Sequence, residues 1–577
     1  MNYPIWELPA SGLLIAFVGI VHVFVSHFAV GGGLFLVVTE RKARRENDAA
    51  MLEYVRRHSR FFVLLTLVFG AITGVGIWFT IGLVHPAATS WLINAFVWGW
   101  AIEWVFFFTE IAAAMVYYYG WDRLTTRQHL AVGWIYFGAA WASLAIINGI
   151  LTFMMTPGAW IETHSFWAGF FNPTYWPALV LRTLGAVGLA GIYALFTASW
   201  LAEPGLRLRI ARYAALGWVL PMALGLPLAL FWYFGAAAGA GVPVADMLGA
   251  ASAAGGDLAK ALVSPAAFGH PIAQMAFRTT LMGAAVALLL ALSMMFVRGR
   301  AAVRVLAAAL MVAALASIGG AEWVREDLRK PYVIGAQMFV NGIRLPPPPG
   351  SPAAATAAED DYRIDRLFES GVLASARWTD LPAEIRAAEA TTVENEARAG
   401  REVFRLLCSQ CHTIDGYLAI RPLVKGKSAA SIEGTLDRLA VAHDASGAPT
   451  EWNATAKLVT WRNRAMPPFV GTDREEWALA VYLATLGGGS TEPTMPPASA
   501  AIADGAALFE ESCAMCHGEG TDWPIAPRIA GRTEDQIYAL IGRLPELNDM
   551  MPPFEGTDAQ RHALATHLAS LGAAGGK

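Results

Sequence analysis

The sequence predicts an all-α membrane protein, in which a bundle of eight transmembrane helices is followed by two small helical domains. Of the 577 residues, 55% are hydrophobic and only 15% are charged, whereas soluble proteins carry about 25% charged residues. The apolar segments lie within residues 1–320, and the composition is that of a soluble protein from about residue 345 onward. A set of motifs that occurs twice after residue 390 predicts the two small domains.

Eight apolar segments reach the length of about 20 residues that a helix needs to cross a bilayer. These segments run over residues 13–38, 61–84, 94–119, 129–151, 176–200, 211–234, 272–297 and 300–320. Residues 1–10 lack the basic stretch of a signal peptide, so we expect the first segment to be a transmembrane helix.

Basic residues gather in every second loop between these segments. The loops after the first, third, fifth and seventh segments carry Arg41, Lys42, Arg44, Arg45, Arg123, Arg127, Arg207, Arg209, Arg298 and Arg300. Because basic loops face the cytoplasm, we expect the N-terminus and everything after residue 320 on the outer side of a bacterial cell membrane. The net charge of −4 gives no indication of nucleic-acid binding.

The soluble part begins with a Pro- and Ala-rich stretch at residues 345–360, which is typical of a linker. We therefore expect four parts in the chain. They are a transmembrane region at 1–335, a linker region at 336–390, and two small helical domains at 391–488 and 489–577.

Both small domains contain the same motifs in the same order. In the first domain, a Gly-x-x-x-Phe pattern precedes Cys408-x-x-Cys411-His412, and Met-Pro-Pro-Phe begins at Met466. The second domain repeats this order with Gly505-x-x-x-Phe509, Cys513-x-x-Cys516-His517 and a Met-Pro-Pro-Phe that begins at Met551.

The Cys-x-x-Cys-His pattern indicates a covalently attached c-type haem, because both thiols can form thioethers and the adjacent His can bind the iron. A Met thioether commonly completes the coordination, and the candidates are Met466 and Met551, with Met550 as the alternative in the second domain. A zinc site or a redox-active dithiol is the other interpretation of such Cys pairs. The flanking residues resemble class I cytochrome c domains.

Ionisable side chains inside the apolar segments are costly in a bilayer, so each is a candidate functional residue. They include His22, His27, Glu103, Glu110, Arg182, Arg278 and Glu322. Glu103 and Glu110 are seven residues apart and share one helical face. Such a set suits buried haem, with His or Glu for iron, carboxylates for protons and Arg for propionates. The alternative is charge pairing between helices, for example between Glu110 and Arg182.

The first 335 residues contain the runs Gly19-Ile20-Val21-His22, Ala101-Ile102-Glu103, Phe106-Phe107-Phe108-Thr109-Glu110, Gly120-Trp121-Asp122-Arg123-Leu124, Gln128-His129, Asn148-Gly149, Asn172-Pro173, Glu322 and Arg329-Lys330-Pro331-Tyr332. In these runs the chain resembles the large subunit of cytochrome bd oxidases. The resemblance implies that His22 and Glu322 each bind one active-site haem, and that Glu103 and Glu110 lie on the proton route or beside the oxygen-binding iron. The candidates for contacts with haem propionates are Arg278, Arg329 and Lys330.

Two departures from that family bear on the electron donor. The family's low-spin haem b uses a His and a Met where this sequence has Arg182 and Thr280, with Met282 two residues further on. We therefore expect this haem to be absent or bound by other imidazoles, for which the candidates are His27, His85, His164 and His270. The long quinol-binding loop is not evident in residues 235–271, where Lys260 and Asp257 are weak substitutes, so quinol is not the expected donor.

These features predict a bd-like terminal oxidase that takes electrons through two covalent c-type haems and reduces dioxygen to water. The membrane region is expected to hold about two haems of type b, type d or both. Expected partners are lipid, a soluble or membrane cytochrome as donor, and a second membrane subunit or a second copy of the chain. Two alternatives remain, which are a nitric oxide or peroxide reductase of the same architecture and a non-enzymatic electron-transfer subunit.

Overall fold

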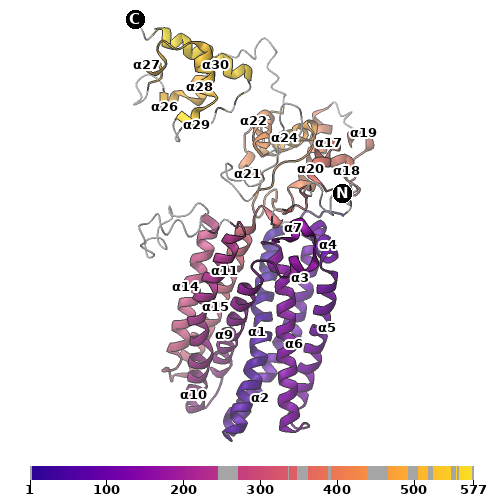
Figure 1. Cartoon of the computed structure of the whole chain (residues 1–577), viewed down its shortest axis with the longest axis vertical. Helices are drawn as coiled ribbons and strands as arrows, with labels where there is room; N and C mark the ends of the chain where they lie inside the picture. Colours follow the sequence, from indigo (N-terminus) through magenta and orange to yellow (C-terminus); the bar gives the residue numbers. More distant parts are fainter. Residues whose placement is uncertain are drawn as a thin grey trace. The chain divides into compact units, whose positions relative to one another are not determined.

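The computed structural model describes residues 3–8, 10–242, 244, 271–335, 337–346, 362–386, 392–439, 466–491, 505–517, 524–547, 551, 554, 556 and 558–574. The chain divides into two compact units, Met1–Thr491 and Glu492–Lys577. The first unit contains the membrane bundle and the first small domain, and the second unit contains the second small domain (Figure 1).

The described residues contain eight helical spans that are long and apolar enough to cross a membrane, which confirms the predicted fold class. The spans are Gly12–Arg45, Ala49–Val84, Val97–Tyr119, Thr126–Phe153, Tyr175–Ala198, Pro204–Gly239, Met275–Ser293 and Arg300–Arg329. Several are longer than the apolar segments of the sequence, because the helices continue into their polar ends. Glu322 therefore lies inside the last helix, seven residues before its end.

The spans are built from single or consecutive helices. The bundle comprises α1 (Ser11–Arg45), α2 (Ala49–Val63), the π-helix η1 (Leu64–Gly70), α3 (Ala71–Val84), α5 (Val97–Tyr119), α6 (Thr126–Phe153), α9 (Tyr175–Ala198), α10 (Pro204–Ala214), the π-helix η2 (Ala215–Val219), α11 (Leu220–Gly239), α14 (Pro271–Ser293) and α15 (Arg300–Arg329). Shorter helices at the ends of the spans are α4 (Pro86–Ala95), α7 (Trp160–Thr163) and α8 (Phe166–Phe170).

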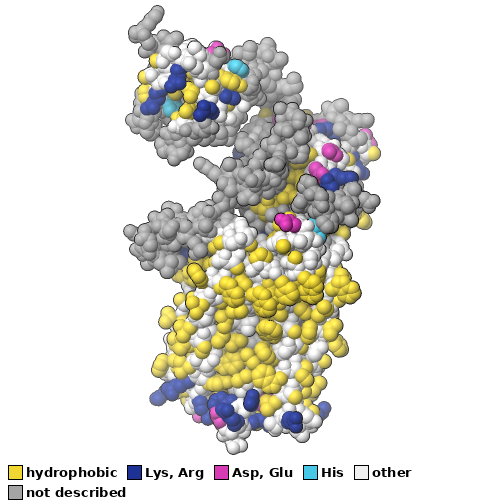
Figure 2. All heavy atoms as spheres, viewed as in Figure 1, with side chains coloured by type: hydrophobic (Ala, Val, Ile, Leu, Met, Phe, Trp, Pro, Cys, Tyr) yellow, Lys and Arg dark blue, Asp and Glu magenta, His cyan; other side chains and the backbone are white. Residues whose placement is uncertain are grey.

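The first helix packs against much of the bundle. It contacts α2, α3, α6, α9 and α15, while α5 packs on α6 and α14 packs on α15. Helices α1 and α9 approach closely at Gly31, where a Cβ atom would lie 1.9 Å from the carbonyl oxygen of Ala186. Hydrophobic side chains cover the sides of the bundle, and Lys and Arg gather at one end of it (Figure 2).

A short hairpin of β1 (Tyr332–Ile334) and β2 (Met338–Phe339) follows the last span, paired antiparallel. The first small domain then contains α17 (Ile364–Ser370), α18 (Val372–Ser375), α19 (Ala383–Arg386), α20 (Val393–Leu407), α21 (Arg421–Val424), α22 (Ala429–Leu439) and α24 (Asp473–Gly487). Helices α20 and α24 pack directly on each other. Their apolar faces form one core that includes Phe404, Phe469 and Leu479.

The second unit contains α25 (Gly505–Ser512), α26 (Ala514–His517), α27 (Ala526–Ile529), α28 (Glu534–Ile541), α29 (Leu544–Leu547) and α30 (Asp558–Ala574). Here α30 packs against α25, α27 and α28. Phe509 and Leu564 belong to the core of this unit. The pairing of a first and a last helix is the same as that of α20 and α24, as the sequence repeat predicts.

Candidate functional site

The first Cys-x-x-Cys-His motif begins at the C-terminal end of α20. The helix ends as the backbone N–H of Cys408 donates to the carbonyl of Phe404 at 2.8 Å, and the N–H of His412 donates to the carbonyl of Cys408 at 2.8 Å. His412 Nδ1 lies 3.0 Å from the carbonyl oxygen of Leu418, so Nδ1 carries the proton. The lone pair of His412 is therefore on Nε2, which is the arrangement of an iron-binding imidazole.

The two thiols of this motif are not joined in a disulfide. Burial raises the pKa of the Cys408 thiol to about 12 and that of the Cys411 thiol to about 11. A redox-active dithiol has a lowered thiol pKa, so the raised pKa of both thiols argues against that alternative. Among the described residues, no cluster of three or more His, Cys, Asp or Glu side chains could hold a metal ion.

Met466 is half-buried and begins the described segment that leads into α24. Phe469, the last residue of its Met-Pro-Pro-Phe motif, lies in the same core as Phe404, and Cys408 packs against that core. The motif therefore belongs to the domain that holds the thiols. The role of Met466 as an iron ligand stays a prediction.

The second motif has the same local structure. Cys513 packs against the core that contains Phe509, and the backbone N–H of His517 donates to the carbonyl of Cys513 at 2.8 Å. Met551 is half-buried. The side chain of Cys516 and all of Met550 lie outside the described residues, so the complete ligand set of this domain stays a prediction.

In the membrane region, His22 is held by a hydroxyl from the neighbouring span. Its Nδ1 lies 3.1 Å from Thr73 Oγ1, while that hydroxyl donates to the carbonyl of Phe69 at 2.7 Å. Thr73 therefore accepts from His22, and the lone pair of His22 is on Nε2. Gly74 leaves the space for the ring, because a Cβ atom there would lie 3.2 Å from His22 Cε1. The lone pair on His22 Nε2 therefore suits an iron ligand.

Glu322 lies between two arginines from different helices. Arg325 Nε donates to Glu322 Oε2 at 3.0 Å, and Arg182 Nη2 is 4.0 Å from Glu322 Oε1. Charge pairing between helices is therefore present, as the alternative interpretation expects, but Arg182 faces Glu322 and not Glu110. Among the described residues, the ion-pair partner of Glu322 Oε1 is the more distant Arg182, so this oxygen suits an iron ligand better than Oε2 does.

The arginines near the end of α15 also fit a bound anion. Arg325 Nη1 and Arg329 Nε are buried and have no hydrogen-bond partner among the described residues. Buried guanidinium groups are normally satisfied, and haem propionates would supply acceptors. Arg329 also donates to the carbonyl of Val333 at 2.9 Å and pairs with Glu326.

The two acidic residues of α5 each accept one hydrogen bond from α6. Ser143 Oγ donates to Glu103 Oε1 at 2.8 Å, and Tyr136 Oη donates to Glu110 Oε1 at 2.9 Å. Both carboxylates lie on the face of α5 that packs on α6, as their spacing predicts. Tyr136 is a partner that the sequence argument missed.

Two family models match parts of this chain. Residues 11–249 match the family model of cytochrome bd terminal oxidase subunit I. These residues are a bd oxidase subunit I region. Residues 395–483 and 500–568 match the model of subunit III of cbb3-type cytochrome c oxidase, so the two small domains are cytochrome c domains.

A solved structure of bd oxidase from Geobacillus thermodenitrificans is similar to this chain at 16% sequence identity and a TM-score of 0.45. The similarity covers 56% of this chain and 87% of that one. The comparison with curated proteins finds no match.

Two positions bear on the low-spin haem of the bd family. Thr280 lies against α15, where a Cβ atom at Gly320 would lie 2.6 Å from Thr280 Oγ1. The side chain of Met282 is 66% exposed on the outside of the bundle. Thr280 carries no thioether, and the thioether of Met282 does not face the interior of the bundle. Arg278, on the same helix, is half-buried, and its contact with a propionate stays a prediction.

The other candidate imidazoles that the structure describes have different surroundings. His27 is buried, and its Nδ1 lies 2.9 Å from the carbonyl oxygen of Val23. His164 packs on Trp160, and its buried Nε2 has no hydrogen-bond partner among the described residues. His85 binds Gln410 of the first cytochrome c domain, a contact that the sequence argument missed. His270, Lys260 and Asp257 lie outside the described residues.

Proposed function

We propose that this protein is a membrane terminal oxidase that takes electrons through two c-type haems and reduces dioxygen to water. The reaction uses one O2, four electrons and four protons to form two water molecules. The family matches support a haem oxidoreductase with cytochrome c domains. The observation that carries the proposal is the direct contact of the first haem-attachment motif with the bd-type bundle.

That contact is polar and buried. Gln410 stands between the two haem-binding cysteines and is 4% exposed. Its Oε1 is 2.9 Å from His85 Nδ1, and its Nε2 donates to the carbonyl of Asn341 at 3.3 Å. Cys411 packs against the hydrophobic cluster that fills the bundle. An electron-delivery domain has to be held close to its acceptor, and these contacts hold this one.

One helix also links the two candidate haem regions. Lys330 and Glu326, at the end of α15, are the charged neighbours of Cys411. Glu322 lies on the same helix, seven residues before Arg329. The last helix of the bundle therefore connects the Glu322 region with the first haem-attachment motif, which supports electron input from the cytochrome c domain.

Each haem would be held by residues already described. The ligands would be His412 with Met466, His517 with Met551, and, for the membrane haems of type b, type d or both, His22 and Glu322. The propionate contacts would be Arg278, Arg329 and Lys330. When bound, such haems supply one-electron chemistry and an open iron that binds dioxygen. Glu103 and Glu110 would hold protons for the reaction.

We further propose that the basic end of the bundle faces the cytoplasm, so that the cytochrome c domains lie outside a bacterial cell membrane. The donor would be a reduced soluble or membrane-bound cytochrome. A second membrane subunit or a second copy of this chain would cover part of the exposed apolar surface, which includes Trp98, Trp104 and Phe108 on α5.

The test uses the purified full-length protein. A CO-difference spectrum of the reduced protein should show an open haem iron, and an oxygen electrode should record O2 consumption with a reduced c-type cytochrome as donor. The absence of a CO shift would make the protein a six-coordinate electron carrier. Consumption of nitric oxide or peroxide without consumption of O2 would give it a different substrate. Pyridine haemochrome analysis would count the c, b and d haems.

A further inference from the structure

Helices α5 and α6 carry polar side chains at matching seven-residue intervals. On α5 these are Glu103, Glu110 and Tyr117, and on α6 they are His129, Tyr136 and Ser143. Seven residues make almost two helical turns, or about 10 Å. Because the two helices are antiparallel neighbours, the six residues form three levels that run from the basic end of the bundle to its interior.

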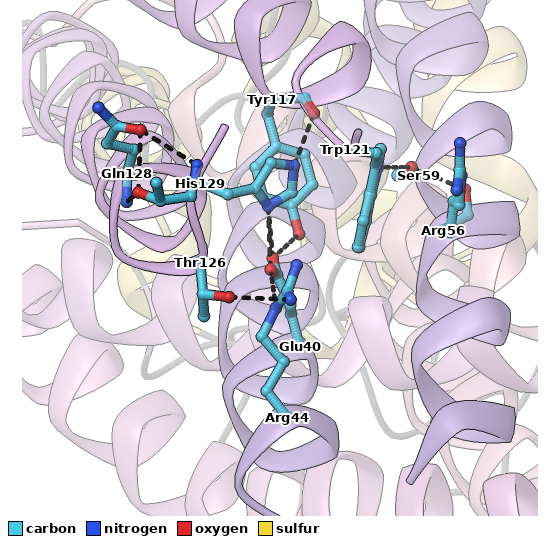
Figure 3. A network of polar contacts seen from close by, with 10 residues as sticks. Glu40, Arg44, Arg56, Ser59, Tyr117, Trp121, Thr126, Gln128 and His129 are labelled. Carbon is cyan, nitrogen blue, oxygen red and sulfur yellow. Dashed lines mark hydrogen bonds and ion pairs between the residues drawn. The ribbon is translucent and has the colours of Figure 1, made fainter. Parts of the chain in front are cut away.

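Two of these levels are the pairs Glu103 with Ser143 and Glu110 with Tyr136. The third level, nearest the basic end, is the pair of Tyr117 and His129, whose ring centroids are 4.2 Å apart. This level contains a further acid, Glu40 of α1, whose side chain is fully buried. Figure 3 shows Glu40 directly below the two rings, with Arg44 beside it.

Every polar atom of the Glu40 carboxylate has a partner. Tyr117 Oη donates to Oε2 at 2.7 Å, and Arg44 Nε donates to Oε1 at 2.7 Å. His129 Nδ1 lies 2.9 Å from both oxygens. The titratable groups that face Glu40 are therefore Arg44 of α1, Tyr117 of α5 and His129 of α6. Thr126 lies on the far side of Arg44, at 3.1 Å from its Nη1.

The partners of His129 fix where its protons are. His129 Nε2 lies 2.9 Å from the carbonyl oxygen of Tyr117. A carbonyl only accepts hydrogen bonds, so Nε2 carries a hydrogen. The contact between Nδ1 and the Glu40 oxygens then requires one more proton, on either the imidazole or the carboxyl group. The pair of Glu40 and His129 therefore holds one proton that is shared between two bases.

A small cavity separates this level from the next one. It has a volume of about 10 Å³, and its walls include Tyr117, Tyr136, Gly33 and Gly133. The two glycines leave room beside the phenol rings. A Cβ atom at Gly33 would lie 2.3 Å from Tyr136 Cε1, and one at Gly133 would lie 3.1 Å from Tyr117 Cε2. The other walls are the apolar residues Leu36, Phe62, Val63 and Ala114, so the two tyrosines are the polar side chains beside the space. Its volume is at the lower limit for one water molecule.

We propose that Glu40 and His129 take up protons at the basic end of the bundle and pass them, through Tyr117 and the cavity, to Tyr136 and Glu110. This inference rests on the proposed function, because the reduction of dioxygen consumes protons. Each transfer moves one proton from the Glu40 and His129 pair to the Glu110 carboxylate. Solvent at the Arg44 side then returns one proton to the pair, so no other bond changes.

The test is the substitution Glu40→Gln in the full-length protein. Glutamine keeps the size and a hydrogen-bonding oxygen but holds no transferable proton. We expect O2 consumption to fall at least about tenfold, with the haem content and the CO-difference spectrum unchanged. Proton uptake after an oxygen pulse, followed with a pH-sensitive dye, should slow to the same extent.

The matched control is Tyr213→Phe. Tyr213 Oη bonds Thr39, the neighbour of Glu40 on α1, at 3.2 Å, but it lies off the α5 and α6 levels. This variant should keep the wild-type rate. If Glu40→Gln fails to assemble, Tyr117→Phe removes the relaying hydroxyl while the Glu40 and His129 pair remains, and it should slow proton uptake in the same way.

Several outcomes would overturn the inference. Wild-type turnover and proton uptake in the variants would exclude this route, and a loss of activity in proportion to lost haem would make Glu40 a structural tie between three helices. If the wild-type protein itself consumed no O2, the proposed function would fail instead. The two failures are therefore distinguishable.

Discussion

His85 Nδ1 lies 2.9 Å from Gln410 Oε1, although 325 residues separate the two positions in the chain. His85 stands at the corner between α3 and α4, and Gln410 stands inside the first haem-attachment motif. This hydrogen bond therefore joins the bd-type bundle to the first cytochrome c domain. Gln410 is buried, so we expect the bond to contribute to the stability of the contact and to electron delivery.

Substitution of Gln410 by Ala should loosen this contact. It leaves the buried N–H of His85 without an acceptor, which costs about 1–3 kcal/mol. We expect a lower midpoint of thermal unfolding for the first cytochrome c domain and slower O2 consumption with a reduced cytochrome donor. Covalent haem content should be unchanged. Thr485→Ala, at an exposed site on α24, is the control, and equal rates in both variants would contradict the prediction.

The same contact should depend on pH. Burial holds the pKa of His85 below its ordinary value of 6.5, and the hydrogen bond with Gln410 opposes this only in part. Below pH 6.5 the His85 side chain takes up a proton in the unfolded chain but not in the native state. The free energy of unfolding is therefore unaffected by His85 above this pH and decreases as the pH falls below it. In the wild type, the midpoint of thermal unfolding should be lower at about pH 5.5 than at about pH 7.5. A similar loss in His85→Gln would assign the effect to other groups.

Much of the architecture could be predicted from the sequence, because segment length and composition report membrane spans directly. The eight spans and the repeated cytochrome c motif are of this kind. The partners across helices could not be predicted in this way. Periodicity shows which residues share a face, but it does not show which faces meet, so Arg182 could have paired with Glu110 as easily as with Glu322.

Glu40 illustrates a second limit of the sequence argument. It lies directly before Arg41 and Lys42, so it belonged to a charged loop whose basic residues indicate topology. In the structure its side chain is fully buried, because α1 continues to Arg45 and carries Glu40 against α5 and α6. The signal in the sequence that could have indicated this polar site is the seven-residue spacing of Tyr117 from Glu110 and of His129 from Tyr136.

A larger residue at Gly74 should affect the membrane haem selectively. A Cβ atom at Gly74 would already lie 3.2 Å from His22 Cε1, so Gly74→Val should displace the imidazole from its place beside Thr73. Pyridine haemochrome analysis should then show fewer membrane haems per covalent haem c. Gly82→Val on the same helix is the control, because nothing lies within 4 Å of a Cβ atom there. A full complement of membrane haem in Gly74→Val would argue against His22 as a ligand.

The glycine that begins each Gly-x-x-x-Phe motif should be essential to its cytochrome c domain. A Cβ atom at Gly400 would lie 1.8 Å from the carbonyl oxygen of Ala478, and one at Gly505 would lie 2.1 Å from that of Ala563. Both contacts are with backbone of the last helix of the domain, which cannot move aside without separating the two helices.

Gly400→Ala should therefore destabilise the first domain by about 1–3 kcal/mol or more. The change should appear as a lower midpoint of thermal unfolding and as less covalent haem. Gly434→Ala, where a Cβ atom would meet nothing within 4 Å, should leave both unchanged. Because the second domain is a separate compact unit, Gly505→Ala should remove one haem c and leave the other. Loss of both haems from either variant would mean that the two domains depend on each other for folding.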